Sequence, residues 1–433
     1  MSLWKIAWRS IQQRKLASAL TALSMALGVA LVVAVIVIYE VVDQSFRRGA
    51  QGYELIVGAK GSPLELVLTS VYHVGRAPAG MPFFVYDELV RGEFAADVES
   101  AIPICMGDTF KGFRVIGTHP DMFDRLEYLD GRQYEFAEGR NFRLDAPFEA
   151  VLGATAARKT GLKVGEKFKP VHGSAAERGE EHDPFEVVGV LAPTGTPNDR
   201  ALFVNMEGFY HLHTKAPDDA EEGSTARAKD KGGAAHAGEH GHDEADEHKQ
   251  VTAVLVVLNP NMIATRRVAL PKLMARELDV QAVRPSEEIT RLLEGIVGRI
   301  QLILLILAVM IVVVAGIGIM VSIYNSMSDR RRDIAIIRAL GARRSTIMIV
   351  VLMESILLAL GGGAIGLVLG HGLTGVAAGW IGDQTGVPVS ALQFQLSELI
   401  LIPFLVVLAS IVGFLPAVVA YRTDVAQSLI ASP

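Results

Sequence analysis

The residues best suited to ligate a metal ion lie in one polar segment, 215–249. Among its aspartates and glutamates stand four histidines: His236, His240, His242 and His248. Imidazoles at this density can collect Zn²⁺, Ni²⁺ or Cu²⁺. Their irregular spacing defines no closed tetrahedral site, so a solvated polar linker remains the alternative to a Zn²⁺-binding loop.

The same segment lacks the residues that build a core. From Lys215 to Lys249 there is no Leu, Ile, Val, Met or aromatic residue. Burial of apolar surface therefore cannot offset the entropy that is lost when this stretch becomes ordered. We predict a disordered loop inserted between two strands.

Motifs for other chemistry are missing from the sequence. It contains no G-x-x-x-x-G-K-[ST] phosphate loop, no H-E-x-x-H helix and no G-x-S-x-G elbow. Cys105 is the only cysteine, which excludes an intramolecular disulfide, and we interpret it as a small buried hydrophobe in a strand rather than a reactive thiol. We predict a chain that is not an enzyme, and any ATP that drives it would bind to a partner subunit.

A short basic segment lies between two apolar runs, at residues 329–345. Ile334, Ile337 and Leu340 recur at intervals of three, which favours one apolar face of a helix, and Gly341 would end that helix. Charged side chains border this face: Arg330, Arg331, Arg332, Asp333, Arg338 and Arg343. The pattern predicts a helix at the membrane surface that a partner could grip. The alternative is that the arginines only keep this segment on the cytoplasmic side of the membrane and bind no partner.

The elements that position this segment are long apolar blocks. Half of the residues are hydrophobic and a fifth are charged, so the apolar residues must be segregated rather than spread over one soluble core. Four blocks reach the roughly 20 residues that a helix needs to cross a bilayer. We predict transmembrane helices at residues 16–42, 296–324, 347–369 and 399–421.

The orientation follows from the short segments around these helices. Lys and Arg are frequent in 1–15 and 325–346, whereas 370–398 has neither. By the positive-inside rule, both termini, the tail 422–433 and segment 325–346 face the cytoplasm. A cleaved signal peptide is disfavoured because the first apolar run is long and lacks a small-x-small site.

One carboxylate and several glycines distinguish the predicted third helix. Glu354 lies inside it, where an ionised group usually faces a bundle interior or a partner, so we predict a packing or coupling role, with a proton relay as the alternative. Gly361, Gly362, Gly363 and Gly366 favour close approach of a neighbouring helix over nucleotide binding.

The remaining residues, 43–295, form one large insertion outside the membrane. Runs rich in β-branched and aromatic residues predict strands at 53–57, 101–105, 112–117, 185–191, 201–205 and 251–258. Helical patterns at 87–94, 154–160 and 261–278 fall between them. We predict four transmembrane α-helices with a large α+β extracytoplasmic domain inserted between helices 1 and 2.

Five segments, taken together, resemble the motifs of a known protein family. They are the entry helix from Trp4 to Gly28, the helix-and-turn signature from Ala150 to Phe168, the strand Phe185 to Leu191, the pattern R-R-x-E-I-x-x-x-x-A-x-G-A-x-x at 329–345, and Pro416, Ala417 and Ala420 near the end of the last helix. In this order the chain resembles the MacB/FtsX-like permease family of ABC transporters, which includes the lipoprotein-releasing permeases LolC and LolE. Asp424 departs from the family, which often has a proline near that position.

The resemblance implies a bacterial inner-membrane permease, with its large domain in the periplasm, that transmits movement. Such permeases pair with a second copy or a paralogue and dock on two ATPase subunits through the segment that corresponds to 330–343. We expect a lipid-linked or periplasmic substrate, with a periplasmic or lipoprotein partner and no nucleic acid. An FtsX-like signalling permease that regulates an extracytoplasmic enzyme, and a Zn²⁺-linked transport system, are the alternatives.

Overall fold

The computed structural model describes residues 3–49, 52–128, 131–172, 183–214, 249–329, 334, 336–338, 341–385, 394 and 396–422. The chain divides into two compact units. The helical unit comprises residues 1–43, 294–381 and 388–433, and the sheet unit comprises 44–293 and 382–387. In the described part of the chain, four helices are long and apolar enough to cross a membrane.

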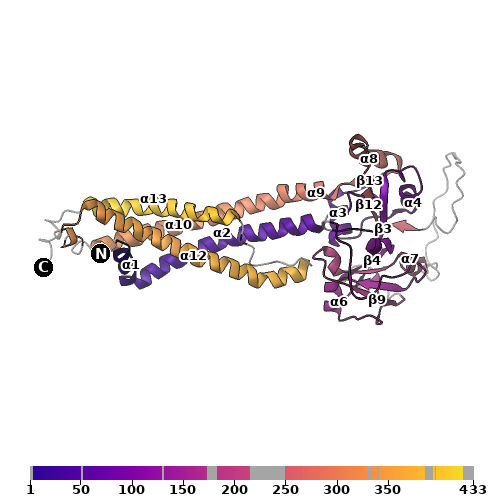
Figure 1. Cartoon of the computed structure of the whole chain (residues 1–433), viewed down its shortest axis with the longest axis horizontal. Helices are drawn as coiled ribbons and strands as arrows, with labels where there is room; N and C mark the ends of the chain where they lie inside the picture. Colours follow the sequence, from indigo (N-terminus) through magenta and orange to yellow (C-terminus); the bar gives the residue numbers. More distant parts are fainter. Residues whose placement is uncertain are drawn as a thin grey trace, which may run out of the picture. The chain divides into compact units, whose positions relative to one another are not determined.

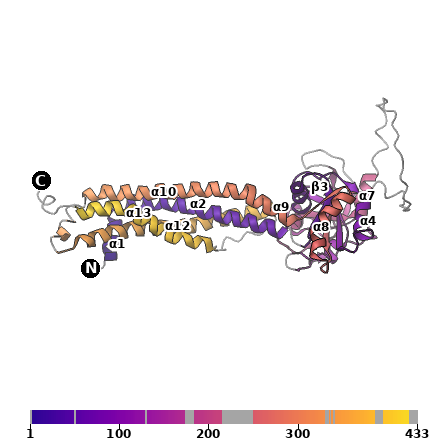
Figure 2. The ribbon, with the colours of Figure 1, turned by 90° about the horizontal axis from the view of Figure 1, so that it is seen from above.

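The helical unit is built from long helices that run beside one another (Figure 2). They are α1 (Leu3–Gln13), α2 (Lys15–Gly49), α10 (Gly298–Asp329), α12 (Arg344–Thr385) and α13 (Leu401–Arg422), with a 3₁₀ turn, η3 (Leu396–Ile400), before α13. α10 packs along α13. The four predicted apolar blocks therefore form the four candidate spans.

Glycines bring α12 and α2 into close contact. A methyl group added at Gly362 would lie 2.8 Å from the carbonyl oxygen of Ala22, and one added at Gly366 would lie 2.5 Å from that of Ala26. Small residues on one face let helix backbones approach in this way. The prediction of close helix approach is confirmed at these two glycines, whereas Gly361 faces open space.

We predicted that the third span ends at residue 369 and that a loop fills 370–398. This prediction was wrong for residues 370–385. α12 continues to Thr385, and residues 396–400 form the turn η3. The prediction followed the apolar run that ends at Leu369. Beyond this run, His371 Nε2 lies 2.9 Å from Glu398 Oε2, and both side chains are largely buried. Because this pairing joins residues far apart in the chain, the local composition concealed it.

The sheet unit is organised around one mixed sheet of eleven strands among the described residues. Nine strands follow the order β13 (Val280–Val283), β1 (Leu55–Ala59), β12 (Ala253–Leu258), β3 (Val98–Phe110), β4 (Phe113–Thr118), β10 (Ala201–Asn205), β6 (Glu149–Leu152), β9 (Phe185–Leu191) and β5 (Phe136–Gly139). β7 (Lys167–Phe168) pairs with β9, and β8 (Val171–His172) pairs with β3. β2 (Met81–Pro82) and β11 (Gln250–Val251) form a separate pair.

Helices cover this sheet, and α8 packs on β13 while α4 packs on β3 (Figure 1). The helices of the unit are α3 (Pro63–Tyr72), α4 (Phe84–Val90), α5 (Asp121–Asp124), α6 (Ala154–Thr160), α7 (Met206–Thr214), α8 (Ala264–Glu277) and α9 (Pro285–Leu292). A short 3₁₀ turn, η1, spans Pro197–Arg200, and a π-helical segment, η2 (Leu293–Val297), joins α9 to α10. The predicted mixture of strands and helices is confirmed; the strands at 185–191 and 201–205 and the helix at 154–160 have the predicted bounds.

Cys105 lies in β3 and is buried. Its thiol donates a hydrogen bond to Tyr210 Oη at 3.3 Å. Burial is the main cause that raises the pKa of this thiol to about 12. A thiol with such a pKa is a poor nucleophile near neutral pH, which confirms its interpretation as a small buried side chain.

Candidate functional site

The candidate site lies at the end of the helical unit where α10 ends, α12 begins and α1 packs beside them. Five residues of the predicted coupling segment are described here: Ile334, Ile337, Arg338, Gly341 and Arg343. The other predicted coupling residues, Arg330, Arg331, Arg332, Asp333 and Leu340, lie outside the described residues.

Gly341 ends a helical turn, as predicted. Its backbone has φ of +101°, in the left-handed region that favours glycine. The Gly341 N–H donates to the carbonyl of Arg338, and the Ala342 N–H donates to the carbonyl of Ile337. This pair of bonds is the Schellman arrangement that satisfies the last carbonyls of a helix. α12 then starts at Arg344.

The predicted apolar face is divided between two environments. Ile334 is buried, whereas Ile336 and Ile337 are exposed. Arg338 is part-buried and Arg343 is exposed. Both isoleucines of the predicted stripe that are described, Ile334 and Ile337, line the same cavity.

Glu354 connects α12 to α1. Its Oε2 accepts a hydrogen bond of 2.7 Å from Ser10 Oγ, and the two residues are 1% and 8% exposed. The hydroxyl stabilises a carboxylate that would otherwise be costly among apolar helices. The expected packing against another element is therefore present, but the identity of the partner was missed. Ser10 lies about one helical turn after the buried Ala7. A polar residue on this buried face was the available sign that Ser10 pairs with a polar group of another helix.

Arg14 connects the junction of α1 and α2 to α10. Its Nη2 donates to the carbonyl oxygen of Ser322 at 2.6 Å and lies 3.3 Å from Ser322 Oγ. Together with the Ser10 bond, this contact joins the amino-terminal helices to both helices that flank segment 330–343. A further contact at this end places the Arg344 guanidinium 6.0 Å from the centre of the Tyr421 ring, which brings the start of α12 to the end of α13.

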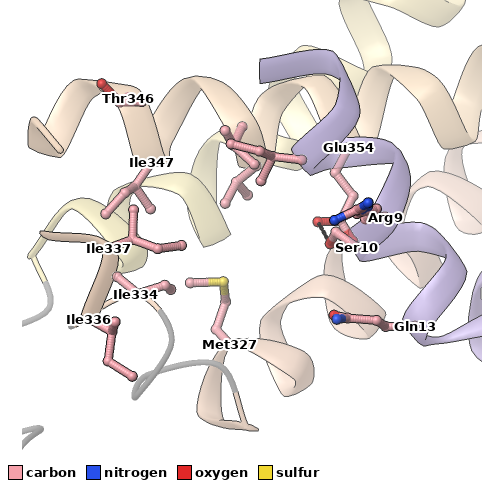
Figure 3. Close-up of a pocket in the computed structure, with 13 residues that line it drawn as sticks. Arg9, Ser10, Gln13, Met327, Ile334, Ile336, Ile337, Thr346, Ile347 and Glu354 are labelled. Atoms are coloured by element: carbon pink, nitrogen blue, oxygen red, sulfur yellow. Dashed lines mark hydrogen bonds between the residues drawn. The ribbon is translucent and has the colours of Figure 1, made fainter. Parts of the chain in front are cut away.

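These elements line an open cavity of about 500 Å³. Figure 3 shows Arg9, Ser10 and Glu354 on one side of it, with Ile334 and Met327 on another. Its walls come from α1, α10, α12 and the residues before Gly341. The cavity thus touches α1, α10 and α12, which the hydrogen bonds of Ser10 and Arg14 also connect.

The predicted metal site lies in a different part of the chain. His236, His240, His242 and His248 are outside the described residues. Among the residues that are described, no group of three or more His, Cys, Asp and Glu side chains could hold a metal ion.

Two protein families match the chain. The MacB-like periplasmic core domain matches residues 18–237, which is half of the chain, and the FtsX-like permease C-terminal domain matches residues 305–425. This chain belongs to the MacB/FtsX-like permease family of ABC transporters. The part of the candidate site on α10 and α12, together with Gly341, falls within the FtsX-like match, whereas α1 precedes both matched regions. With its four apolar helices, the chain is a membrane-embedded permease.

Individual relatives match shorter regions. The macrolide export ATP-binding/permease protein MacB of Chromobacterium violaceum is 35% identical over 134 residues, 30% of this chain and 20% of that protein. The protein of the same name from Bordetella avium is 33% identical over 167 residues, 37% of this chain and 24% of that protein. The matched regions thus span about a fifth to a quarter of these curated relatives.

A solved structure is also similar to this chain. It is the extracellular domain of the noncanonic ABC-type transporter YknZ from Gram-positive bacteria. The match covers 54% of this chain and 99% of that domain, with 13% sequence identity and a TM-score of 0.30.

Proposed function

We propose that this chain is the non-catalytic permease subunit of an ABC transporter, in which a separate ATPase subunit hydrolyses ATP and drives movements of the sheet unit. The family match supports an ATPase partner. The relatives named above are ATP-binding/permease proteins, whereas these 433 residues contain no phosphate loop. ATP would accordingly bind to the partner and not to this chain.

The observation that carries the proposal is a pair of hydrogen bonds at the candidate site, one buried and one part-buried. Ser10 of α1 donates a hydrogen bond to Glu354 of α12, and Arg14 donates one to the Ser322 carbonyl of α10. A displacement of segment 330–343 would act on both helices that it connects, and these contacts would carry α1 and α2 along. Helical residues continue from α2 up to Gly49 and from α9 into α10. Such stiff elements transmit displacement with little loss.

The substrate that we propose is lipid-linked or periplasmic, with lipoprotein release of the LolC/LolE kind preferred to macrolide export. The subunit would pair with a second copy or a paralogue in the bacterial inner membrane, with both termini in the cytoplasm and the sheet unit in the periplasm. An FtsX-like regulator of an extracytoplasmic enzyme is the alternative. The genes beside this one would distinguish them, since an adjacent cell-wall hydrolase favours the regulator.

A Zn²⁺-linked system is the weaker alternative, because it depends on the histidine-rich segment 215–249 alone. Calorimetric titration of the full chain with Zn²⁺ tests it. The same stoichiometry with and without residues 215–249 would exclude the segment as a metal site.

The docking step can be tested by charge reversal. We expect the double variant Arg338→Glu, Arg343→Glu to lose an ABC-type ATPase that is co-expressed from the neighbouring genes and co-purified. Arg422→Glu is the matched control, because Arg422 is an exposed arginine at the end of α13, next to Tyr421. Retention of the ATPase at wild-type level by the double variant would refute docking through this segment.

A further inference from the structure

The last turn of α2 is bonded to the sheet unit by two tyrosine hydroxyls. Tyr72 Oη donates a hydrogen bond to the carbonyl oxygen of Phe46, and Tyr53 Oη donates one to that of Gly49 at 3.2 Å. The last four carbonyls of a helix have no partner inside that helix. Because α2 ends at Gly49, the two hydroxyls satisfy carbonyls that its own backbone leaves open.

The Tyr72 ring also packs against this turn. Its centre lies 4.8 Å from that of the Phe46 ring. A methyl group added at Gly49 would lie 2.6 Å from Tyr72 Cε1 and 3.2 Å from Pro197 Cδ. Since Tyr72 is the last residue of α3 and Pro197 the first of η1, the end of α2 contacts both elements.

α3 is capped at both ends and buried along most of its length. At its start, Ser62 Oγ accepts a hydrogen bond of 3.4 Å from the Glu65 N–H. At its end, His73 has φ of +58° and its N–H donates to the carbonyl of Leu68. Five of its ten residues are buried, namely Leu66, Val67, Thr69, Ser70 and Val71. A close-packed helix of this kind shifts as a whole and does not deform gradually.

α9 packs on the same helix, α3. Through η2, α9 continues into α10. Residues 46–49 and α9 both lie inside the sheet unit, and each is continuous with a candidate membrane span. Two segments that connect the sheet unit to membrane spans therefore contact one short helix.

α3 is also linked to the middle of the sheet. It packs on η1, and His73 Nε2, just after α3, lies 3.0 Å from Asn198 Oδ1 in η1. η1 leads directly into β10, which lies between β4 and β6. A shift of α3 would thus act on a central strand through η1.

We propose that α3 is the joint through which α2 and α9 act together on the sheet. Tyr72 bonds the end of α2 to this joint, α9 packs on it, and the contact of His73 with Asn198 transmits its displacement to η1 and β10. The coupling of α2 to α9 through α3 depends on these contacts alone. Its use in transport rests on the proposed function.

A matched pair of variants tests the joint. Tyr72→Phe and Tyr53→Phe each remove one hydroxyl that bonds to the last turn of α2 and keep the aromatic ring, but only Tyr72 belongs to α3. Hydrogen exchange of the full-length chain in detergent, followed by mass spectrometry, measures local opening without the ATPase.

We expect both variants to speed exchange in residues 46–49 about fivefold, as the loss of one hydrogen bond implies. Only Tyr72→Phe should also speed exchange in α9 and η1, by about threefold, a size typical of coupling between packed elements. Exchange in α4, which packs on β3, should stay at the wild-type rate in both variants.

The role in transport is tested with the ATPase bound. In the wild-type complex, we expect ATP to change the exchange of α3. Tyr72→Phe should still co-purify with the ATPase, because Tyr72 lies outside segment 330–343, but the ATP-dependent change in α3 should become severalfold smaller.

The outcomes separate the joint from the proposed function. Exchange that rises in 46–49 alone, equally in Tyr72→Phe and Tyr53→Phe, would overturn the joint. An ATP-dependent change in α3 that is the same with and without the Tyr72 hydroxyl would overturn its role in transmission. If no ATPase co-purifies with the wild-type chain, the proposed function fails, and the comparison of the two variants still decides whether α3 couples α2 to α9.

Discussion

The helical unit and the sheet unit use buried polar groups in different ways. In the helical unit, a buried hydrogen bond between Ser10 and Glu354 connects α1 to α12, while glycines of α12 meet α2. In the sheet unit, His73 Nε2 donates to Asn198 Oδ1 at 3.0 Å, and Asn198 Nδ2 donates to Tyr134 Oη at 2.7 Å. This second network fixes the loops around a core of large aromatic side chains.

This difference in packing bears on which unit can change its shape and which unit is rigid. The helices of the helical unit also pack through an apolar cluster that includes Met25, Val312 and Leu405, and packed helices can shift against one another as bodies. The core of the sheet unit contains Phe94, Phe142, Phe185 and Phe203, all fully buried, and a core of this kind does not deform gradually. This contrast supports the coupling movement proposed above, with the shift in the helical unit.

The largest expected effect concerns the sheet unit and pH. Burial lowers the pKa of His73 to about 4, below its ordinary value of about 6.5. Between these values the unfolded chain binds a proton that the folded chain does not, so stability is complete above pH 6.5 and falls as the pH drops toward 4. The loss is about 3 kcal/mol, at about 1.4 kcal/mol per pH unit.

Denaturant unfolding of the full chain at several pH values measures this loss. Labelling of Cys105 with a pyridyl disulfide reports on the sheet unit alone, because that thiol is buried there. His73→Asn tolerates the positive φ of this position and should remove most of the pH dependence. If the unfolding free energy of this variant falls with pH as steeply as that of the wild type, groups other than His73 cause the loss.

A smaller effect is expected where α12 meets α2. Gly366→Ala would place a methyl group 2.5 Å from the carbonyl oxygen of Ala26, and backbone cannot yield as a side chain does. We expect a loss of about 2 kcal/mol, typical of overpacking, in the unfolding free energy measured in detergent by tryptophan fluorescence. The control Gly361→Ala meets open space and should stabilise the helix by about 0.5–1 kcal/mol. Equal effects of the two substitutions would contradict close packing at Gly366.

The smallest effect is expected from Ser10→Ala, at about 1 kcal/mol, because the Glu354 carboxylate loses one donor while the fold keeps its apolar contacts. The control is Ser24→Ala, since that exposed hydroxyl bonds only to Leu20 within its own helix among the contacts described. If the contact transmits movement, Ser10→Ala should also lower ATPase-driven activity more than its stability loss explains. An unchanged ATPase-driven activity would show that the contact between Ser10 and Glu354 contributes to packing alone.

Part of the candidate site could be predicted from the sequence because its signals are local. The apolar blocks identify the four candidate spans, and Gly341 ends a helix because glycine adopts a positive φ without strain. The position of Glu354 within such a block indicated that its carboxylate needs a partner. The end of α12 was predicted too early, because the prediction followed the apolar run that ends at Leu369, and the buried pair of His371 and Glu398 lies beyond that run.

The sequence by itself determined which segments are apolar enough to span a membrane, where strands and helices alternate in the inserted unit, and which family the chain resembles. These properties depend on composition and on neighbours within a few residues. Only the tertiary structure decided that Ser10 meets Glu354, that Arg14 meets Ser322 and that a cavity lies between them. The paired residues are separated by 344 and 308 positions, and contacts at such separations depend on how whole helices pack rather than on any local pattern.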